Sequence, residues 1–261
     1  MSRGLNWLQA LAGGQALAGY PASVKVVDGT LGERAARYIA VVPDAENPFP
    51  RARNGEVGLL EGWALGQALD EVIAADRDKA DKRVVVAVVD VPSQAYGRRE
   101  EALGIHQALA GAVDSYARAR LAGHPVIALL VGKAMSGAFL AHGYQAQRII
   151  ALRDPDVMVH AMGKAAAARI TLRSVEELEA LAESVPPMAY DIDNYATLGL
   201  LSETLAVDSI EQPSADDLAR VRDCLNKAVA DIGDSSDLRG RLGAPNRKAS
   251  SRVRELLRAQ W

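Results

Sequence analysis

Two unbroken apolar runs constrain the fold of this chain more than any other feature. The first is the valine-rich segment at residues 84–91, and the second is VIALLVG at residues 126–132. Neither run alternates apolar with polar residues, which is typical of strands buried on both faces of a parallel sheet. Residues 99–123 between them have helical periodicity and end in Gly123. A strand, a helix and a second strand in this order predict a crossover-connected parallel sheet covered by helices.

Shorter elements are predicted around this unit. The first residues predict an irregular cap, and residues 43–56 predict a loop because prolines and polar residues dominate them. β-Branched runs predict strands at residues 24–29 and 37–43, and residues 147–163 predict two short strands joined by a turn. Helical periodicity predicts further helices at residues 59–75, 175–183, 195–205, 215–232 and 247–261, and a turn with a short helix at 133–143.

Charge and cysteine content exclude several classes of protein. The formal net charge is −3 at pH 7, so the chain lacks the basic surface expected of a nucleic-acid-binding protein. Cys224 is the sole cysteine, which excludes an intrachain disulfide and argues against a cysteine-based zinc site. The N-terminus lacks the apolar core of a signal peptide, and no apolar run reaches the roughly 18 residues of a membrane span. We expect a cytoplasmic protein without nucleic acid, membrane or metal among its partners.

The last predicted helix, at residues 247–261, combines basic residues with an apolar face. An amphipathic helix at a terminus either docks on a partner or packs against its own domain. Of the two, packing on its own domain is the simpler expectation. No internal repeat or domain boundary interrupts the sequence, so we expect residues 1–261 to form a single domain with C-terminal helices.

Small residues follow both central strands, where a ligand could approach the backbone. The first turn covers residues 90–97 and the second covers residues 132–138. Glycine and alanine at such a turn let a ligand reach backbone N–H groups. Two adjacent donors, such as the N–H groups of Gly137 and Ala138, can form an oxyanion hole. The alternative is that these residues only allow close packing between helix and sheet.

Three segments in order resemble a known family. They are VDVPSQAYGRREEALG at residues 89–104, HPVIALLVGKAMSGAF at 124–139 and RDPDVMVHAMG at 153–163. Their order and spacing resemble the carboxyl half of acyl-CoA carboxyltransferases, in the crotonase superfamily. The resemblance covers residues 80–205. It implies an α/β, crotonase-like fold (a ββα spiral), with parallel sheets and surrounding helices.

Departures from the carboxyltransferase pattern indicate which branch of that family the chain resembles most. The carboxyltransferase loop has glycine, an aromatic residue and proline where this chain has Ser93, Gln94 and Tyr96, and it has glycine at the position of Ser136. The chain also lacks the amino half that holds the acyl-CoA. It most resembles the family of malonate decarboxylase gamma subunits, of the biotin-independent type. This implies pairing with a beta subunit and decarboxylation of a malonyl thioester. That thioester is carried on the phosphopantetheine of a separate acyl carrier protein or on coenzyme A, with no cofactor bound by this chain.

The resemblance also implies which residues act. Gly137 and Ala138 would be the catalytic oxyanion donors, because loss of CO₂ leaves an enolate whose negative charge lies on the thioester oxygen. Ser93 and Tyr96 are candidates for a proton relay to that enolate. The residues implied to contact substrate are Ser93, Gln94, Ala95, Tyr96, Gly97 and Ser136.

The sequence is compatible with three further classes of protein. Residues 137–139 and 157–160 resemble strings of the Clp protease subunit, which has the same fold and a serine nucleophile with a histidine base. However, the matching register puts Met135 at the nucleophile position, and Ser136 is one residue away. His160 is either an acid–base group or a structural histidine. The second class is a stand-alone acyl-CoA crotonase, and the third is a non-catalytic subunit that completes a partner's site.

Overall fold

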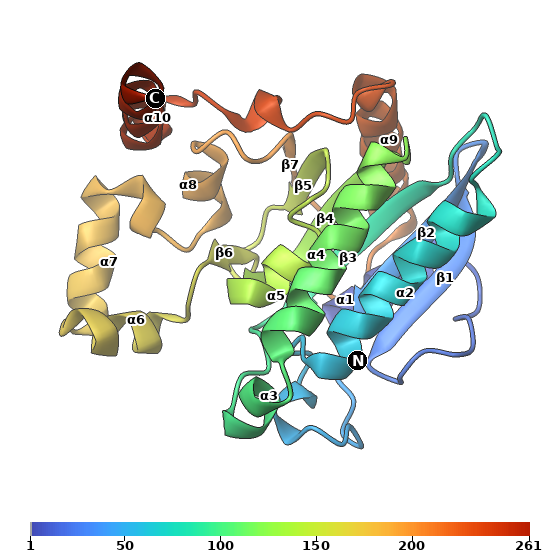
Figure 1. The fold of residues 1–261 in the computed structure, drawn as a ribbon, viewed down its shortest axis with the longest axis horizontal. Coiled ribbons are helices and arrows are strands. Elements are labelled where there is room, and N and C mark those ends of the chain that lie inside the picture. The colour runs from blue at the N-terminus through green and yellow to red at the C-terminus, as the bar shows by residue number, and fades with distance from the viewer. Residues whose placement is uncertain (1) are drawn as a thin grey trace.

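A seven-stranded sheet organises the structure, a computed structural model that describes residues 2–261. The strand order is β1-β2-β3-β4-β5-β7, and β6 pairs with the far end of β4 (Figure 1). β1 and β2 are antiparallel, and every other pair is parallel. The strands are β1 (Val24–Leu31), β2 (Arg34–Val41), β3 (Val84–Val91), β4 (Val126–Met135), β5 (Arg148–Leu152), β6 (Met158–His160) and β7 (Glu203–Leu205).

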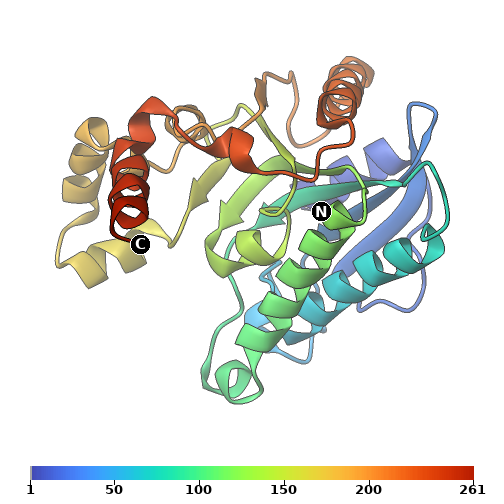
Figure 2. The ribbon, with the colours of Figure 1, turned by 45° about the horizontal axis from the view of Figure 1, so that its top comes forward.

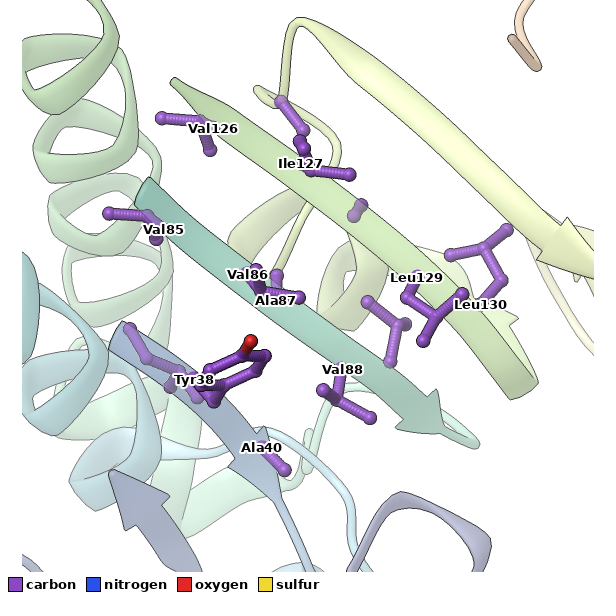
Figure 3. Close-up of a cluster of buried hydrophobic side chains, with 14 of the residues drawn as sticks. Tyr38, Ala40, Val85, Val86, Ala87, Val88, Val126, Ile127, Leu129 and Leu130 are labelled. Atoms are coloured by element: carbon purple, nitrogen blue, oxygen red, sulfur yellow. The ribbon is translucent and has the colours of Figure 1, made fainter. Parts of the chain in front are cut away.

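The two apolar runs form the centre of this sheet, as predicted. β3 and β4 lie side by side, and their side chains interleave with Tyr38 of β2 and its neighbours (Figure 3). Val85, Val88, Ile127 and Leu129 are completely buried. Such strands need cover on both faces. Helices α2 (Leu59–Ala75) and α4 (Ile105–Leu121) pack side by side over one face, and α1 (Arg3–Ala12) and α9 (Ala215–Ile232) cover the other (Figures 1 and 2). The expected α/β, crotonase-like fold with surrounding helices is confirmed, and the predicted parallel sheets form a single sheet whose edge strand β1 is antiparallel.

Three predictions about helices are wrong. The irregular cap contains α1, whose first turn is capped by the Ser2 hydroxyl and which buries Trp7 against the sheet. The predicted helix at residues 99–123 is two helices, α3 (Arg98–Ala102) and α4, because Gly104 lies between them with a φ of +81°. The predicted helix at 195–205 is α8 (Ile192–Ala196) followed by strand β7, which pairs with β5.

Most of the remaining predictions hold with small shifts. The helices at residues 59–75 and 215–232 begin and end where the periodicity places them, and residues 43–56 are a loop with one short 3₁₀ turn. The predicted turn at residues 132–138 is wrong, because β4 continues to Met135 and α5 begins at Ser136, so the strand passes directly into the helix. The remaining helices are α5 (Ser136–Ala141), α6 (Lys164–Thr171), α7 (Val175–Ser184) and α10 (Lys248–Gln260).

Helices α6, α7, α8 and α10 lie to one side of the sheet (Figures 1 and 2). α10 has no buried residue, and Val253, Leu256 and Leu257 are 54%, 42% and 56% exposed. The expectation that this helix packs on its own domain is therefore wrong. No helix within residues 2–261 has the length and apolar character needed to cross a bilayer.

Candidate active site

The candidate oxyanion donors lie at the abrupt junction between β4 and α5. β4 ends at Met135 and α5 begins at Ser136, which has a φ of +57° although it is not glycine. A non-glycine residue in this left-handed region is strained and is found mostly where the fold or the function requires it. Gly137 and Ala138 follow in the first turn of α5, with Gly137 half-buried and Ala138 completely buried. The junction thus carries the N–H groups of these residues to the carboxyl end of the central strand.

A cavity of about 480 Å³ opens beside this junction. Ser136 and Gly137 form part of its wall, and most of its other lining is apolar, from α5 and from residues near α8. Phe139, Tyr195 and Leu198 are representative of this lining. Apolar walls with a few convergent polar groups are typical of small-molecule sites. Phe139, Tyr195 and Leu198 were not predicted as site residues, because no local pattern shows that α5 and the segment near residue 195 meet.

Of the predicted substrate loop, Gln94 is the residue that reaches the junction. Its side-chain oxygen accepts a hydrogen bond of 2.8 Å from the backbone N–H of Gly137. The loop backbone is fixed by Val57, whose N–H donates to the Ser93 carbonyl and whose carbonyl accepts from the Ala95 N–H. The Gln94 side chain thus joins the loop after β3 to the start of α5.

In the described part of the chain, none of the predicted loop residues lines this cavity. They are Ser93, Gln94, Ala95, Tyr96 and Gly97. Ala95 is buried beneath the loop, and the Tyr96 side chain is 51% exposed. Gly97 lies against the carboxylate of Glu100, so close that an added Cβ would be 2.5 Å from its oxygen. Their positions leave Tyr96 as the loop side chain most accessible to a molecule approaching from outside.

Ser136 and His160 both line the cavity but have separate hydrogen-bond partners. The Ser136 hydroxyl donates to the Ala161 carbonyl at 2.7 Å, whereas Nδ1 of His160 lies 3.0 Å from the Met162 carbonyl. The His160 ring stacks on Tyr190 with 3.9 Å between ring centroids. Burial lowers the pKa of His160, an effect that the hydrogen bond to Met162 partly opposes. A serine nucleophile needs its base within hydrogen-bond reach, and this pairing is not formed.

A buried carboxylate supports the loop from below. Oε1 of Glu61, on α2, accepts from the Ser23 hydroxyl at 2.5 Å and from the Asn47 amide at 2.8 Å. Oε2 accepts from the N–H of Gly58 at 2.9 Å. Since Gly58 follows Val57, this network fixes the segment that pairs with the Gln94 loop. Glu61 was not predicted, because a glutamate in an amphipathic helix carries no sign of its burial.

Asp90 joins the N-terminal helix to the same edge of the sheet. Its carboxylate accepts from the N–H of Gly4 at 3.3 Å and from that of Lys133 at 3.2 Å. A Cβ at Gly132 would lie 2.1 Å from the Asp90 oxygen, so glycine is required there. Asp90 therefore positions the end of β4 just before the Ser136 junction. Among residues 2–261, no three His, Cys, Asp or Glu side chains are grouped as metal ligands.

Comparison with known proteins adds to this geometry. Residues 52–261 match the family model described as malonate decarboxylase gamma subunit. One Pseudomonas malonate decarboxylase was solved as a hetero-tetramer in complex with coenzyme A. A chain of it is 71% identical, with full coverage of both chains and a TM-score of 0.96. A chain of the Pseudomonas MdcD-MdcE hetero-dimer is 69% identical, also with full coverage of both chains, at a TM-score of 0.93.

A curated relative is more distant. It is the malonyl-S-ACP:biotin-protein carboxyltransferase MADD of Malonomonas rubra, which is 34% identical over 187 residues. The match covers 70% of this chain and 61% of that relative. The chain thus spans less than two thirds of the length of the curated relative.

Proposed function

The chain belongs to the family of malonate decarboxylase gamma subunits, and we propose that with a beta subunit it forms the centre that decarboxylates a malonyl thioester. This proposal rests on the first turn of α5, where Gly137 lies in the wall of an apolar cavity and Ala138 follows it, buried behind that wall. Family membership supplies the reaction class, and this segment is where we place the chemistry.

The reaction needs one stabilised charge and one proton. The bond between the carboxylate carbon and the α-carbon breaks, its electron pair moves towards the thioester carbonyl, and CO₂ leaves. The enolate oxygen then accepts hydrogen bonds from the N–H groups of Gly137 and Ala138. One such donor is worth about 3–4 kcal/mol of barrier in comparable enzymes. Protonation of the α-carbon, by water or through Ser93 or Tyr96, gives the acetyl thioester.

The cavity suits the departing group. Its apolar wall, which includes Phe139 and Leu198, excludes water and lowers the local dielectric. A carboxylate that loses solvation there is favoured to become neutral CO₂, as expected for ground-state desolvation. The wall also keeps water from competing for the N–H donors until protonation.

We propose a thioester on a phosphopantetheine arm, carried either by a separate acyl carrier protein or by coenzyme A, as the substrate. The name of the MADD relative specifies malonyl-S-ACP, and coenzyme A is bound in the Pseudomonas hetero-tetramer. Gln94, Tyr96 and Ser136 would contact the acyl end, with Ser93, Ala95 and Gly97 forming the rest of the loop. We propose the biotin-independent type, since the loop departs from the carboxyltransferase pattern at Ser93, Gln94 and Tyr96.

A partner subunit would complete the site. The Pseudomonas relative was solved as an MdcD-MdcE hetero-dimer. In this chain α10 exposes Val253, Leu256 and Leu257, which on a helix lie along one side. We place the beta subunit against this apolar side, because a short helix without tertiary contacts is marginal in water.

Reconstitution tests the proposal. The chain is co-expressed with its beta subunit, and release of ¹⁴CO₂ from carboxyl-labelled malonyl thioesters of carrier protein and of coenzyme A is measured, with and without avidin. CO₂ release that needs both subunits and resists avidin is expected. Transfer of label to a biotinyl protein without release of CO₂ would instead indicate a carboxyltransferase. Thioester hydrolysis with malonate as product would indicate a hydrolase.

A further inference from the structure

The backbone N–H of Gly137 already has an acceptor within the protein. Oε1 of Gln94 lies 2.8 Å from the Gly137 nitrogen, a normal hydrogen-bond length. Because the donor is an N–H group, the Gln94 atom facing it must be the amide oxygen and not the nitrogen. A Cβ on Gly137 would approach the same oxygen to 3.3 Å, so little space separates the two residues.

Hydrogen bonds fix the backbone around Gln94, whereas a single hydrogen bond holds its side chain. The Ser93 carbonyl and the Ala95 N–H on either side pair with Val57, and the Gln94 carbonyl accepts from the Tyr96 N–H at 3.0 Å. Within residues 2–261, the bond to Gly137 is the one hydrogen bond made by the Gln94 side chain. Rotation about the side-chain torsions can therefore uncover the Gly137 N–H without moving the loop.

We propose that the Gln94 side chain is a displaceable cap on the Gly137 N–H, the oxyanion donor. This inference rests on the proposed function, in which the Gly137 N–H stabilises the enolate. The amide oxygen of Gln94 occupies the hydrogen-bonding position that a thioester oxygen needs, so the substrate gains this donor only by displacing it. An amide oxygen and a neutral thioester carbonyl oxygen are acceptors of the same kind. Replacing one by the other therefore adds little to the binding free energy of the ground-state substrate.

Displacement of Gln94 by the substrate oxygen becomes favourable once negative charge develops on that oxygen. A hydrogen bond to an ionised oxygen is roughly twice as strong as one between neutral groups. The enolate oxygen therefore displaces Gln94 more readily than the ground-state carbonyl does. Gln94 therefore weakens the binding of the ground-state substrate to the Gly137 N–H. The additional stabilisation that this N–H gives to the transition state remains. Only an interaction that is stronger in the transition state than in the ground state raises kcat.

Two substitutions of similar size change the cap in opposite directions. Gln94→Met fills the same space but cannot accept a normal hydrogen bond, whereas Gln94→Glu offers the N–H a charged acceptor and repels an anionic substrate. In the reconstituted complex we expect Gln94→Met to lower the KM for malonyl thioester about 3- to 10-fold without raising kcat, the value of one net hydrogen bond. We expect Gln94→Glu to raise KM more than about 10-fold and to lower kcat. Gln107→Glu, at an exposed position on α4, is the matched control for charge.

Hydrogen exchange tests the cap independently of turnover. In the ¹⁵N-labelled chain, Gln94→Met should speed exchange of the Gly137 amide about 3- to 10-fold, and Gln94→Glu should slow it, with amides of β3 unchanged. An unaltered Gly137 exchange rate in both variants, or a KM that rises in Gln94→Met, would overturn the cap. An inactive wild-type complex with the expected exchange pattern would refute the proposed function and leave the cap on Gly137 supported.

Discussion

The Ser136 hydroxyl donates a 2.7 Å hydrogen bond to the carbonyl oxygen of Ala161, which ties the first residue of α5 to the turn after β6. This bond directs the hydroxyl to a backbone acceptor, and no base is paired with it. The same residue has a φ of +57°. Ser136 therefore combines a strained backbone with a compensating side-chain contact, at a position where the carboxyltransferase pattern has glycine.

That combination predicts effects of different size on stability for two small substitutions. Ser136→Gly relieves the backbone strain but loses the bond to Ala161, so its free energy of unfolding should stay within about 1 kcal/mol of wild type. Ser136→Ala loses the bond and keeps the strain, so it should be less stable by about 1–2 kcal/mol. Urea unfolding of both variants measures this difference. Both should retain decarboxylation, and labelling of wild-type Ser136 by a fluorophosphonate probe would contradict the structural role given to its hydroxyl.

The buried Glu61 network predicts a coupling between stability and the site loop. Glu61→Ala leaves Ser23, Asn47 and the Gly58 N–H without their acceptor, and we expect a loss of about 2–4 kcal/mol in the free energy of unfolding. Glu61→Gln keeps one acceptor oxygen and should lose less. Thermal and urea unfolding measure both values. Equal stability of wild type and Glu61→Ala would show that the network does not hold this region.

His142 predicts a dependence of stability on pH. It is completely buried, and burial lowers its pKa to about 4 from the ordinary value of 6.5. Nε2 lies 3.1 Å from the Val88 carbonyl, which can only accept, so Nε2 carries the proton and Nδ1 accepts from the Tyr116 hydroxyl. The unfolded chain binds a proton at this histidine between pH 6.5 and 4, and the folded chain does not.

The stability contributed by neutral His142 is therefore present above pH 6.5 and is lost as the pH falls towards 4. The loss should reach about 3 kcal/mol. Urea unfolding of wild type and His142→Asn across this range measures it, and the difference between the two proteins should shrink by that amount as the pH falls. A difference that stays constant with pH would show that His142 titrates normally in the folded chain.

The exposed apolar side of α10 predicts the effect of charge at the subunit interface. Leu257→Asp should leave the free chain as stable as wild type, because Leu257 is 56% exposed and α10 has no buried residue. In the complex we expect at least a tenfold weaker affinity for the beta subunit, since burial of a lone carboxylate is costly. Glu255→Gln, on the opposite side of the helix, is the control. Isothermal titration of the beta subunit gives both affinities, and an unchanged affinity for Leu257→Asp would place the interface elsewhere.

The parts of this fold that the sequence predicts are those set by local pattern. The runs at β3 and β4 and the periodicity of α9 identify those elements and their bounds. Gly104, which divides the helix predicted at residues 99–123, could not be recognised because glycine also occurs within helices. β7 escaped prediction because a strand of three residues depends on its partner β5 and not on its own composition.

For the candidate site as well, features set by local sequence pattern could be predicted and tertiary contacts could not. Small residues identified the two segments that follow β3 and β4 as candidate site segments, and parallel strands end at one edge of the sheet, which brings such segments together. Tyr195 could not be predicted as part of the cavity, since it comes from helix α8, whose placement depends on tertiary packing. The contact of Gln94 with Gly137 likewise needs side-chain geometry.

Stabilisation of the enolate by the backbone N–H of Gly137 can be tested with a matched pair of substitutions at this residue. Gly137→Pro removes the N–H, whereas Gly137→Ala keeps it and adds a methyl group that Gln94 can accommodate by a small shift. In complexes with the beta subunit that assemble like wild type, kcat for release of CO₂ from malonyl thioester should fall about 10²- to 10³-fold for Gly137→Pro. It should fall less than about tenfold for Gly137→Ala, which retains the donor. Equal kcat values for the two variants would contradict the assignment of the oxyanion donor to this chain.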